Sequence, residues 1–321
     1  MNGTLDLYIP TFEDVKAAHE RIKPYVHRTP VLTSSFFNDL SGAELFFKCE
    51  NFQKAGAFKA RGASNAVFGL SDEVAAKGVA THSSGNHGQS LSYAAGQRGI
   101  KATVIMPHTA PEPKKAAVRG YGGDVLECEP STAARERMLE EFVAKTGADF
   151  VHPYNDHRVI AGQGTCSREL HEEVGPLDAV VAPIGGGGMI SGTCISMSAL
   201  SPSTKVYAAE PEQADDVYRS FHAGTMIEDD APQTVADGLK VSLRPRTWHF
   251  VSTYVHDVLL VSEEEIIEAM YLTWQRMKIV IEPSSAVALA VILKNKQLFA
   301  GQRVGVIFTG GNVDLKKLPW M

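Results

Sequence analysis

Residues 180–189 read VVAPIGGGGM and join an apolar run, four consecutive glycines and the start of a helix-like segment. A short run that is apolar throughout is typical of a strand buried on both faces of a parallel sheet. Glycines after such a strand let backbone N–H groups converge on an anion, and a helix N-terminus adds partial positive charge. The stretch therefore predicts a phosphate cradle, with a tight strand-to-helix turn that binds nothing as the alternative.

Two familiar phosphate loops do not fit this stretch. No Gly-Lys-Ser/Thr follows the glycines, so it is not a Walker loop. A dinucleotide fingerprint would place an acidic ribose partner about 20 residues further on. Lys205 and Val206 stand there, and the first acidic residue is Glu210. A phosphate site without these signs suggests a smaller phosphorylated cofactor, although a nucleotide-dependent oxidoreductase remains the rival class.

Strand-like and helix-like runs alternate along the rest of the 321-residue chain. Strands are expected at residues 45–47, 102–106, 124–126, 150–151, 179–182, 205–209 and 303–308. Helices are expected at residues 88–97, 132–145, 162–174 and 189–200, and two more open at Thr11 and Ser262, each with an acidic residue at the capping-box position. The alternation predicts an α/β fold with right-handed crossovers, and the length favours two domains.

The composition is that of an ordinary globular protein, with 44% hydrophobic and 21% charged residues. A net charge of −6 argues against a general nucleic-acid binder, which normally carries a basic excess. The longest apolar run, residues 286–293, is too short to span a bilayer, and the N-terminus does not read as a secretory signal. Four scattered cysteines predict reduced thiols in a cytoplasmic protein. Together with the net charge and the short apolar runs, this predicts a protein without membrane or nucleic-acid partners.

Three further motifs carry polar chemistry. In GAFKARG (residues 56–62), Lys59 stands beside an aromatic residue, where burial would lower its pKa and free the amine for imine chemistry; a solvated surface lysine is the alternative. SSGNHG (residues 83–88) gathers two hydroxyls, an amide and an imidazole at a predicted helix start, which suits a carboxylate or a simple helix cap. TGGN (residues 309–312), taken alone, is an ordinary turn after a strand.

Together and in this order, these motifs resemble those of the fold-type II pyridoxal-phosphate enzymes, in the branch of serine racemases, serine/threonine dehydratases and 3-hydroxyaspartate ammonia-lyases. Residues 48–53, 161–165, 236–238 and 282–283 extend the resemblance through almost the whole chain. It implies a tryptophan synthase beta-like α/β fold of two open, twisted, mostly parallel sheets flanked by helices. It also implies a large cofactor-binding domain (residues 1–78 and 156–321) and a small mobile domain (residues 79–155) that closes over substrate.

The same resemblance implies the site residues. Lys59 would carry pyridoxal phosphate as an imine and act as base at Cα, and Ser84 would be the acid/base on the opposite cofactor face, which keeps racemisation open. Thr309 at the pyridine nitrogen would leave that nitrogen unprotonated, which favours β-elimination. The implied cofactor contacts are Phe58, Lys59, Asn86, Gly185, Gly186, Gly187, Gly188, Met189 and Thr309. The implied substrate contacts are Ser83, Ser84, Asn86, His87 and Arg135.

A divalent-cation site is expected in the acidic segment after a predicted strand. Glu210 and Asp216 lie six residues apart, and with the carbonyl of Ala214 they offer oxygen ligands that suit Mg²⁺, Mn²⁺ or Ca²⁺. An acidic cluster of this kind is otherwise a solvated loop. The resemblance places a cation at these positions, with an activating or structural role.

The substrate is the least constrained expectation. Residues 127–131, 152–156 and 319–320 are most similar to 3-hydroxyaspartate dehydratases, which implies conversion of 3-hydroxyaspartate to iminosuccinate and then to oxaloacetate and ammonia. Arg135 is the favoured partner for the distal carboxylate, because a closing domain could bring its planar fork onto it. The other candidate cations are His157, Arg158, Arg244 and Arg246. A serine racemase, an L-serine/L-threonine dehydratase or a non-catalytic cofactor carrier are the alternatives, and a homodimer is the habit of the family.

Overall fold

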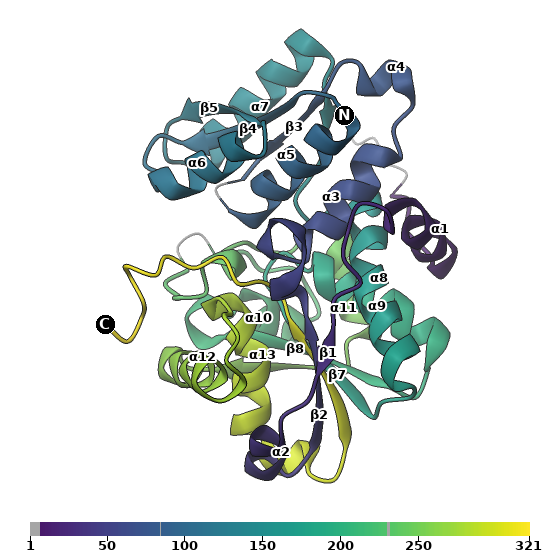
Figure 1. Ribbon diagram of the computed structural model, residues 1–321, viewed down its shortest axis with the longest axis vertical. Helices are drawn as coiled ribbons and strands as arrows, with labels where there is room; N and C mark the ends of the chain where they lie inside the picture. Colours follow the sequence, from purple (N-terminus) through teal and green to yellow (C-terminus); the bar gives the residue numbers. More distant parts are fainter. Residues whose placement is uncertain (1–6, 84, 230–231) are drawn as a thin grey trace.

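The computed structural model describes residues 7–83, 85–229 and 232–321, which form two sheets flanked by helices (Figure 1). The larger sheet has the order β1-β2-β10-β7-β8-β9, and the smaller has the order β5-β4-β3-β6. Only β1 runs antiparallel to its neighbour; the other described pairs are parallel. The strands are β1 (Val31–Leu32), β2 (Glu44–Cys49), β3 (Val79–His82), β4 (Ala102–Pro107), β5 (Asp124–Cys128), β6 (Asp149–Phe150), β7 (Ala179–Pro183), β8 (Lys205–Pro211), β9 (Asp257–Val261) and β10 (Arg303–Phe308).

Helices cover both faces of each sheet, so the α/β fold class predicted from the sequence is confirmed. The α-helices are α1 (Phe12–Ile22), α2 (Ser35–Ser41), α3 (Lys59–Phe68), α4 (Asp72–Ala75), α5 (Asn86–Arg98), α6 (Glu112–Gly120), α7 (Thr132–Thr146), α8 (His157–Val174), α9 (Gly188–Leu200), α10 (Asp216–Ala223), α11 (Pro245–Tyr254), α12 (Glu263–Met277), α13 (Pro283–Lys294) and α14 (Lys296–Phe299). Short 3-10 turns are η1 (Glu50–Phe52), η2 (Lys54–Gly56), η3 (Glu212–Ala214) and η4 (Asp237–Leu239).

The central strands of the larger sheet show why its sequence is apolar throughout. In β7, Ala179 and Val181 face one core, which α13 covers, whereas Val180 and Ala182 face the opposite core, which α9 covers. Alternate side chains of a strand point to opposite faces, so burial of both faces removes the polar alternation of a one-sided strand. Parallel strands also end at the same edge, which brings the segments after β7, β8 and β10 together.

Helix starts follow the capping residues predicted from the sequence. Thr11 caps α1, whose Asp14 side chain accepts a hydrogen bond from the Thr11 backbone N–H at 2.8 Å. Ser262 caps α12 in the same reciprocal arrangement with Glu265. Such boxes satisfy backbone N–H groups that lack an intrahelical partner.

Some elements differ from the sequence-based prediction. The predicted helix at residues 162–174 begins earlier, at His157, because Asp156 caps it by accepting from the Arg158 backbone N–H. The apolar run at residues 286–293 is a buried helix within α13, where tertiary burial hides the periodicity of an amphipathic helix. In the described part of the chain, no helix is both long and apolar enough to cross a membrane.

A fully buried cluster of charges ties α3 to its surroundings. The Arg61 guanidinium pairs with Glu50 at 2.7 Å and with Glu169 at 2.7 Å, and the Lys48 ammonium pairs with Glu169 at 2.8 Å. Each partner satisfies several donors or acceptors, which is what buried charges require. The two positive charges hold the pKa of Glu169 at about 2 despite its burial. The cluster fixes the first turn of α3, which begins at Lys59.

Candidate active site

Lys59 is the first residue of α3, a helix that lies between the two sheets (Figure 1). Its ammonium donates to the carbonyl of Pro153 at 2.8 Å and lies 5.0 Å from the centre of the Phe58 ring. Desolvation lowers the Lys59 pKa to about 8, and the negative charge of Glu282 opposes that shift. Lys59 is half-buried and hydrogen-bonded to a backbone carbonyl, so it is not a fully solvated surface lysine. About a tenth of the amine is then free at pH 7, far more than for an ordinary lysine, and imine chemistry and base catalysis require that free form.

The segment after β10 lies directly against the Lys59 turn. The Phe58 backbone N–H donates to the Thr309 carbonyl at 2.9 Å, and Ala57 forms a bridge with Gly310. The buried Thr309 hydroxyl lies 3.0 Å from the Ser285 hydroxyl at the start of α13. Thr309 thus offers a neutral hydroxyl next to Phe58 and Lys59, and the TGGN turn is more than a strand end.

Asn86, at the start of α5, connects the smaller sheet to this region. Its side-chain amide donates to the Glu282 carboxylate at 2.9 Å and accepts from Asn312 at 3.0 Å. Burial raises the Glu282 pKa to about 7, and the Asn86 bond opposes the shift. Glu282 was noted in the sequence only as part of a family motif, because a lone Glu-Pro pair carries no local sign that it will be buried in a site.

The glycine stretch forms the loop between β7 and α9, as predicted. Gly187 has φ of +83°, a conformation that side chains other than glycine rarely adopt. A Cβ on Gly186 would lie 2.5 Å from the Tyr154 ring, and one on Gly185 would lie 2.8 Å from Leu239. The loop packs closely against other segments at the N-terminus of a 13-residue helix, and Met189 is buried in the first turn. The first N–H groups of such a helix have no intrahelical partner and can bind an anion.

The predicted carboxylate loop lies between β3 and α5. The Ser83 hydroxyl accepts from the Gly85 backbone N–H at 3.2 Å. His87 is buried, its Nε2 lies 3.1 Å from the Val151 carbonyl oxygen, and desolvation lowers its pKa to about 3. A neutral imidazole here leaves the N-terminus of α5 as the positive element. Ser84, the predicted acid/base, lies outside the described residues.

A wall of rings extends from this loop to the glycine loop. The His82 and His152 rings lie 5.9 Å apart, and the His152 and Tyr154 rings lie 4.6 Å apart. Burial lowers the pKa of His152 to about 3, and the positive charge of Arg244 adds to the effect. Burial and the nearby charges of Arg135 and Arg244 likewise lower the pKa of His82 to about 4. Arg135, predicted from the sequence, is thus close enough to this wall to influence it.

Three of the other candidate cations are committed elsewhere. Arg158 pairs with Asp149 at 2.9 Å and with Asp156 at 2.6 Å. Arg246 donates to the carbonyls of Tyr8 and Asn155. The His157 ring packs edge-on against Tyr8 at 5.2 Å. These side chains hold the start of α8 and the segment before it in place.

Glu210 and Asp216 are buried, whereas Glu212 between them is exposed, so the acidic segment is solvated only in part. Glu210, at the end of β8, accepts from the backbone N–H groups of Val217 at 2.9 Å and Tyr218 at 2.7 Å. Burial raises its pKa, and the Asp216 charge raises it further. Asp216 Oδ2 is buried without a hydrogen-bond partner. Among the described residues, no group of three or more His, Cys, Asp and Glu side chains is placed to hold a metal, although carboxylate and carbonyl oxygens are the kind of ligand that a hard cation takes.

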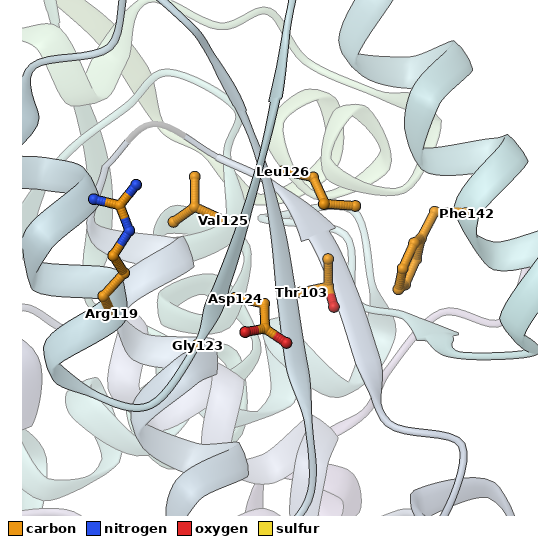
Figure 2. Close-up of a pocket in the computed structure, with 7 residues that line it drawn as sticks. All are labelled: Thr103, Arg119, Gly123, Asp124, Val125, Leu126 and Phe142. Carbon is orange, nitrogen blue, oxygen red and sulfur yellow. The ribbon is translucent and has the colours of Figure 1, made fainter.

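Figure 2 shows a surface pocket of about 400 Å³ that lies apart from these residues. It is lined by Thr103, Arg119, Gly123, Asp124, Val125, Leu126 and Phe142, on β4, β5 and the helices beside them. Its one cation, Arg119, already pairs with Glu112 at 2.7 Å. None of the residues predicted for catalysis, cofactor or metal lines this pocket, so it has no part in the candidate site.

Comparison with known proteins decides the family. Residues 22–310 match the model of the pyridoxal-phosphate dependent enzyme family. The chain belongs to this family. A beta-hydroxyaspartate dehydratase of Paracoccus denitrificans is 67% identical, over 98% of this chain and 100% of that protein. An L-threo-3-hydroxyaspartate ammonia-lyase of Saccharomyces cerevisiae is 44% identical, over 97% and 96%. The crystal structure of the Dictyostelium discoideum serine racemase superposes with a TM-score of 0.92 at 49% identity, over 95% of this chain and 99% of that one.

The fold-type II architecture predicted by resemblance is therefore confirmed, and so is a pyridoxal-phosphate dependent enzyme. The residues fit the cofactor: a desolvated amine of pKa about 8 lies beside an aromatic ring and a buried hydroxyl. The glycine loop at the start of α9 offers the matching phosphate site. These features also remove the nucleotide-dependent oxidoreductase as a rival.

Proposed function

We propose that the chain is an ammonia-lyase that removes water from 3-hydroxyaspartate, giving iminosuccinate, which hydrolyses to oxaloacetate and ammonia. The observation that carries this proposal is the 67% identity, along the full length of both chains, to a beta-hydroxyaspartate dehydratase. The arginine charges beside His82 agree with a substrate that has two carboxylates.

Lys59 is the proposed catalytic base. When bound, the cofactor withdraws electrons from the substrate Cα and so makes its proton acidic. The free amine of Lys59, favoured by its lowered pKa, takes that proton. The Pro153 carbonyl, 2.8 Å from the amine, holds it at the junction of the two sheets. The hydroxyl then leaves Cβ as water with a proton from the site.

Substrate orientation is assigned to the loop between β3 and α5. Ser83, Asn86 and His87 surround the N-terminus of α5, which favours an α-carboxylate. Ser84 is proposed as the acid/base on the other face. Phe58, Thr309 and the loop Gly185 to Met189 hold the cofactor. Neutral Thr309, bonded to Ser285, favours elimination over transamination because it leaves the cofactor nitrogen without a proton.

The remaining assignments complete the proposal. Residues 79–155 form a small domain that closes over the substrate and excludes water, against a large domain of residues 1–78 and 156–321. A divalent cation binds at Glu210, Ala214 and Asp216, supported by the unpartnered, buried Asp216 Oδ2. The enzyme is proposed to be a cytoplasmic homodimer whose partner is a small hydroxyamino acid, not a nucleic acid or a membrane.

The test compares kcat/KM for both 3-hydroxyaspartate diastereomers with those for L-serine and L-threonine, by ammonia release and by keto-acid formation. At least one hydroxyaspartate isomer is expected to be the best substrate. Better turnover of serine than of every hydroxyaspartate isomer would overturn the choice. Absence of turnover with every hydroxyamino acid, in protein that still shows cofactor absorbance, would indicate a carrier.

A serine racemase is the second candidate, because a serine racemase structure aligns at 49% identity over almost the whole chain. It differs in one measurable outcome. A racemase converts L-serine to D-serine faster than it releases ammonia from any substrate. Chiral chromatography of serine after incubation distinguishes the two functions.

A further inference from the structure

The ring wall offers little positive charge of its own. With pKa values of about 4 and 3, His82 and His152 are neutral near pH 7. A neutral imidazole can hydrogen-bond to a carboxylate but does not attract it as an ion. A carboxylate beside these rings therefore depends on arginines for its counter-charge. The two arginines whose charges act on His82 come from different elements, Arg135 from α7 and Arg244 from the start of α11.

Arg244 is fixed next to the glycine loop. It is the N-cap residue of α11, and its backbone N–H donates to the Thr247 hydroxyl at 3.1 Å. Leu243, which precedes Arg244, and Thr247, which accepts its hydrogen bond, both pack against the glycine loop. A Cβ on Gly187 would lie 2.8 Å from Leu243 and 2.9 Å from Thr247. The Arg244 side chain therefore leaves a rigid turn that packs on the proposed phosphate loop.

The Arg244 guanidinium already holds a carboxylate. It pairs with Glu228 at 2.5 Å, and the exposed fractions are 32% for Arg244 and 59% for Glu228. Glu228 faces solvent, so the pair contributes little net stability and the guanidinium can exchange partners. Its charge reaches inward, since it opposes the burial that raises the pKa of Tyr154, whose ring packs on Gly186.

We propose that Arg244 is a specificity-determining residue that binds the distal carboxylate of the substrate. Arg244 lies beside the glycine loop that follows a strand of the larger sheet, and Arg135 lies on α7 beside the smaller sheet, so the two arginines approach the carboxylate from opposite sides. The inference rests on the proposed function and names the residue that separates dicarboxylic from monocarboxylic hydroxyamino acids. Arg135 and Arg244 then bracket one carboxylate between the two halves of the molecule. Glu228 occupies the guanidinium when that carboxylate is absent.

The test uses the cofactor-loaded enzyme and the variants Arg244→Ala and Arg244→Gln. The glutamine variant removes the charge but keeps most of the side chain, so it serves if the alanine variant does not fold. The kcat/KM ratio of 3-hydroxyaspartate to L-serine is expected to fall about 10- to 100-fold, the worth of a charged hydrogen bond. Inhibition by succinate, a dicarboxylate without an amine, is expected to weaken by about 10-fold or more. Arg28→Ala, which breaks the comparable ion pair of Arg28 with Glu172, is the control and should shift neither quantity.

An unchanged substrate ratio together with an unchanged succinate inhibition constant in both folded variants would overturn the role of Arg244. An equal loss with both substrates would also overturn it, because it would indicate general damage to the site. Failure of the wild-type enzyme to act on 3-hydroxyaspartate would instead overturn the proposed function. Thermal unfolding of each variant shows whether it is folded before these comparisons are made.

Discussion

The cofactor side and the substrate side of the candidate site are built differently. On the cofactor side, Thr309 is buried and bonded to Ser285, and Asn86 is held between Glu282 and Asn312. On the substrate side, His82 and His152 are only partly buried, and arginines approach from two separate elements. A rigid cofactor side suits a chemical step that is common to all substrates. A substrate side built from elements beside both sheets suits selection among substrates.

Removal of the Lys59 amine is expected to have the largest effect. Lys59→Ala should lower kcat about 100-fold or more with every hydroxyamino acid, because it removes the general base. Borohydride reduction of the wild-type enzyme should label Lys59, which mass spectrometry of its peptides detects. Lys54→Ala, which removes a nearby lysine of η2 that has no role in the candidate site, is the matched control. Residual activity above about 1% of wild type in Lys59→Ala would contradict the assignment of Lys59 as the base. The cofactor side would then no longer differ from the substrate side in carrying the step that is common to all substrates.

Replacement of Arg135 should affect one class of substrate. Arg135→Ala is expected to lower kcat/KM for 3-hydroxyaspartate about 10-fold or more, with a smaller loss for L-serine, because only the former has a distal carboxylate. Arg137→Ala, on the exposed face of the same helix, serves as control. Equal losses of kcat/KM for the two substrates would show that Arg135 does not discriminate between them.

Chelation is expected to have the smallest effect on activity, and to change stability instead. Without a cation, burial raises the Asp216 pKa to about 6, above its ordinary 3.8, so the folded protein holds a proton that the unfolded chain releases. The resulting stability is present below pH 4 and is lost as pH rises through about 6, by up to about 3 kcal/mol. Denaturant unfolding of chelator-treated protein at pH 5 and pH 7.5 should reveal this loss, and Mg²⁺, Mn²⁺ or Ca²⁺ should restore stability at the higher pH.

Asp216→Asn removes the charge at nearly constant size and is the control for the cation. Its unfolding free energy should respond less to pH and no longer respond to the metal. If chelator and metal leave the wild-type stability equal at pH 7.5, the segment from Glu210 to Asp216 does not bind a cation.

Local patterns in the sequence predicted much of the fold. Apolar runs such as residues 179–182 and 303–308 lie in strands, and the Thr11 and Ser262 caps open helices as expected. The motifs around Lys59, Asn86 and Thr309 are recognisable in the sequence, but their proximity is not. Lys59 and Thr309 converge because they follow β2 and β10, which are parallel neighbours, whereas Asn86 reaches them from the smaller sheet, and no single motif encodes either arrangement.

Other features depend on contacts between distant segments. The burial of Glu282, which raises its pKa, depends on packing against distant segments of the chain, such as the one that carries Asn86, over 190 positions away. The same is true of the ring wall, since His82 and His152 lie on separate segments. Sequence spacing placed Arg244 among five candidate cations but could not show that its charge reaches these rings.

The charge cluster around Arg61 has a consequence for how this chain can vary. Arg61, Lys48, Glu50 and Glu169 are each almost fully buried, and each neutralises another. Loss of one member leaves a buried charge without a partner or water to solvate it. Joint replacement by apolar side chains of similar volume can leave the free energy of unfolding nearly unchanged. The four positions are therefore expected to change together or not at all, because variants that change only one of them are strongly destabilised.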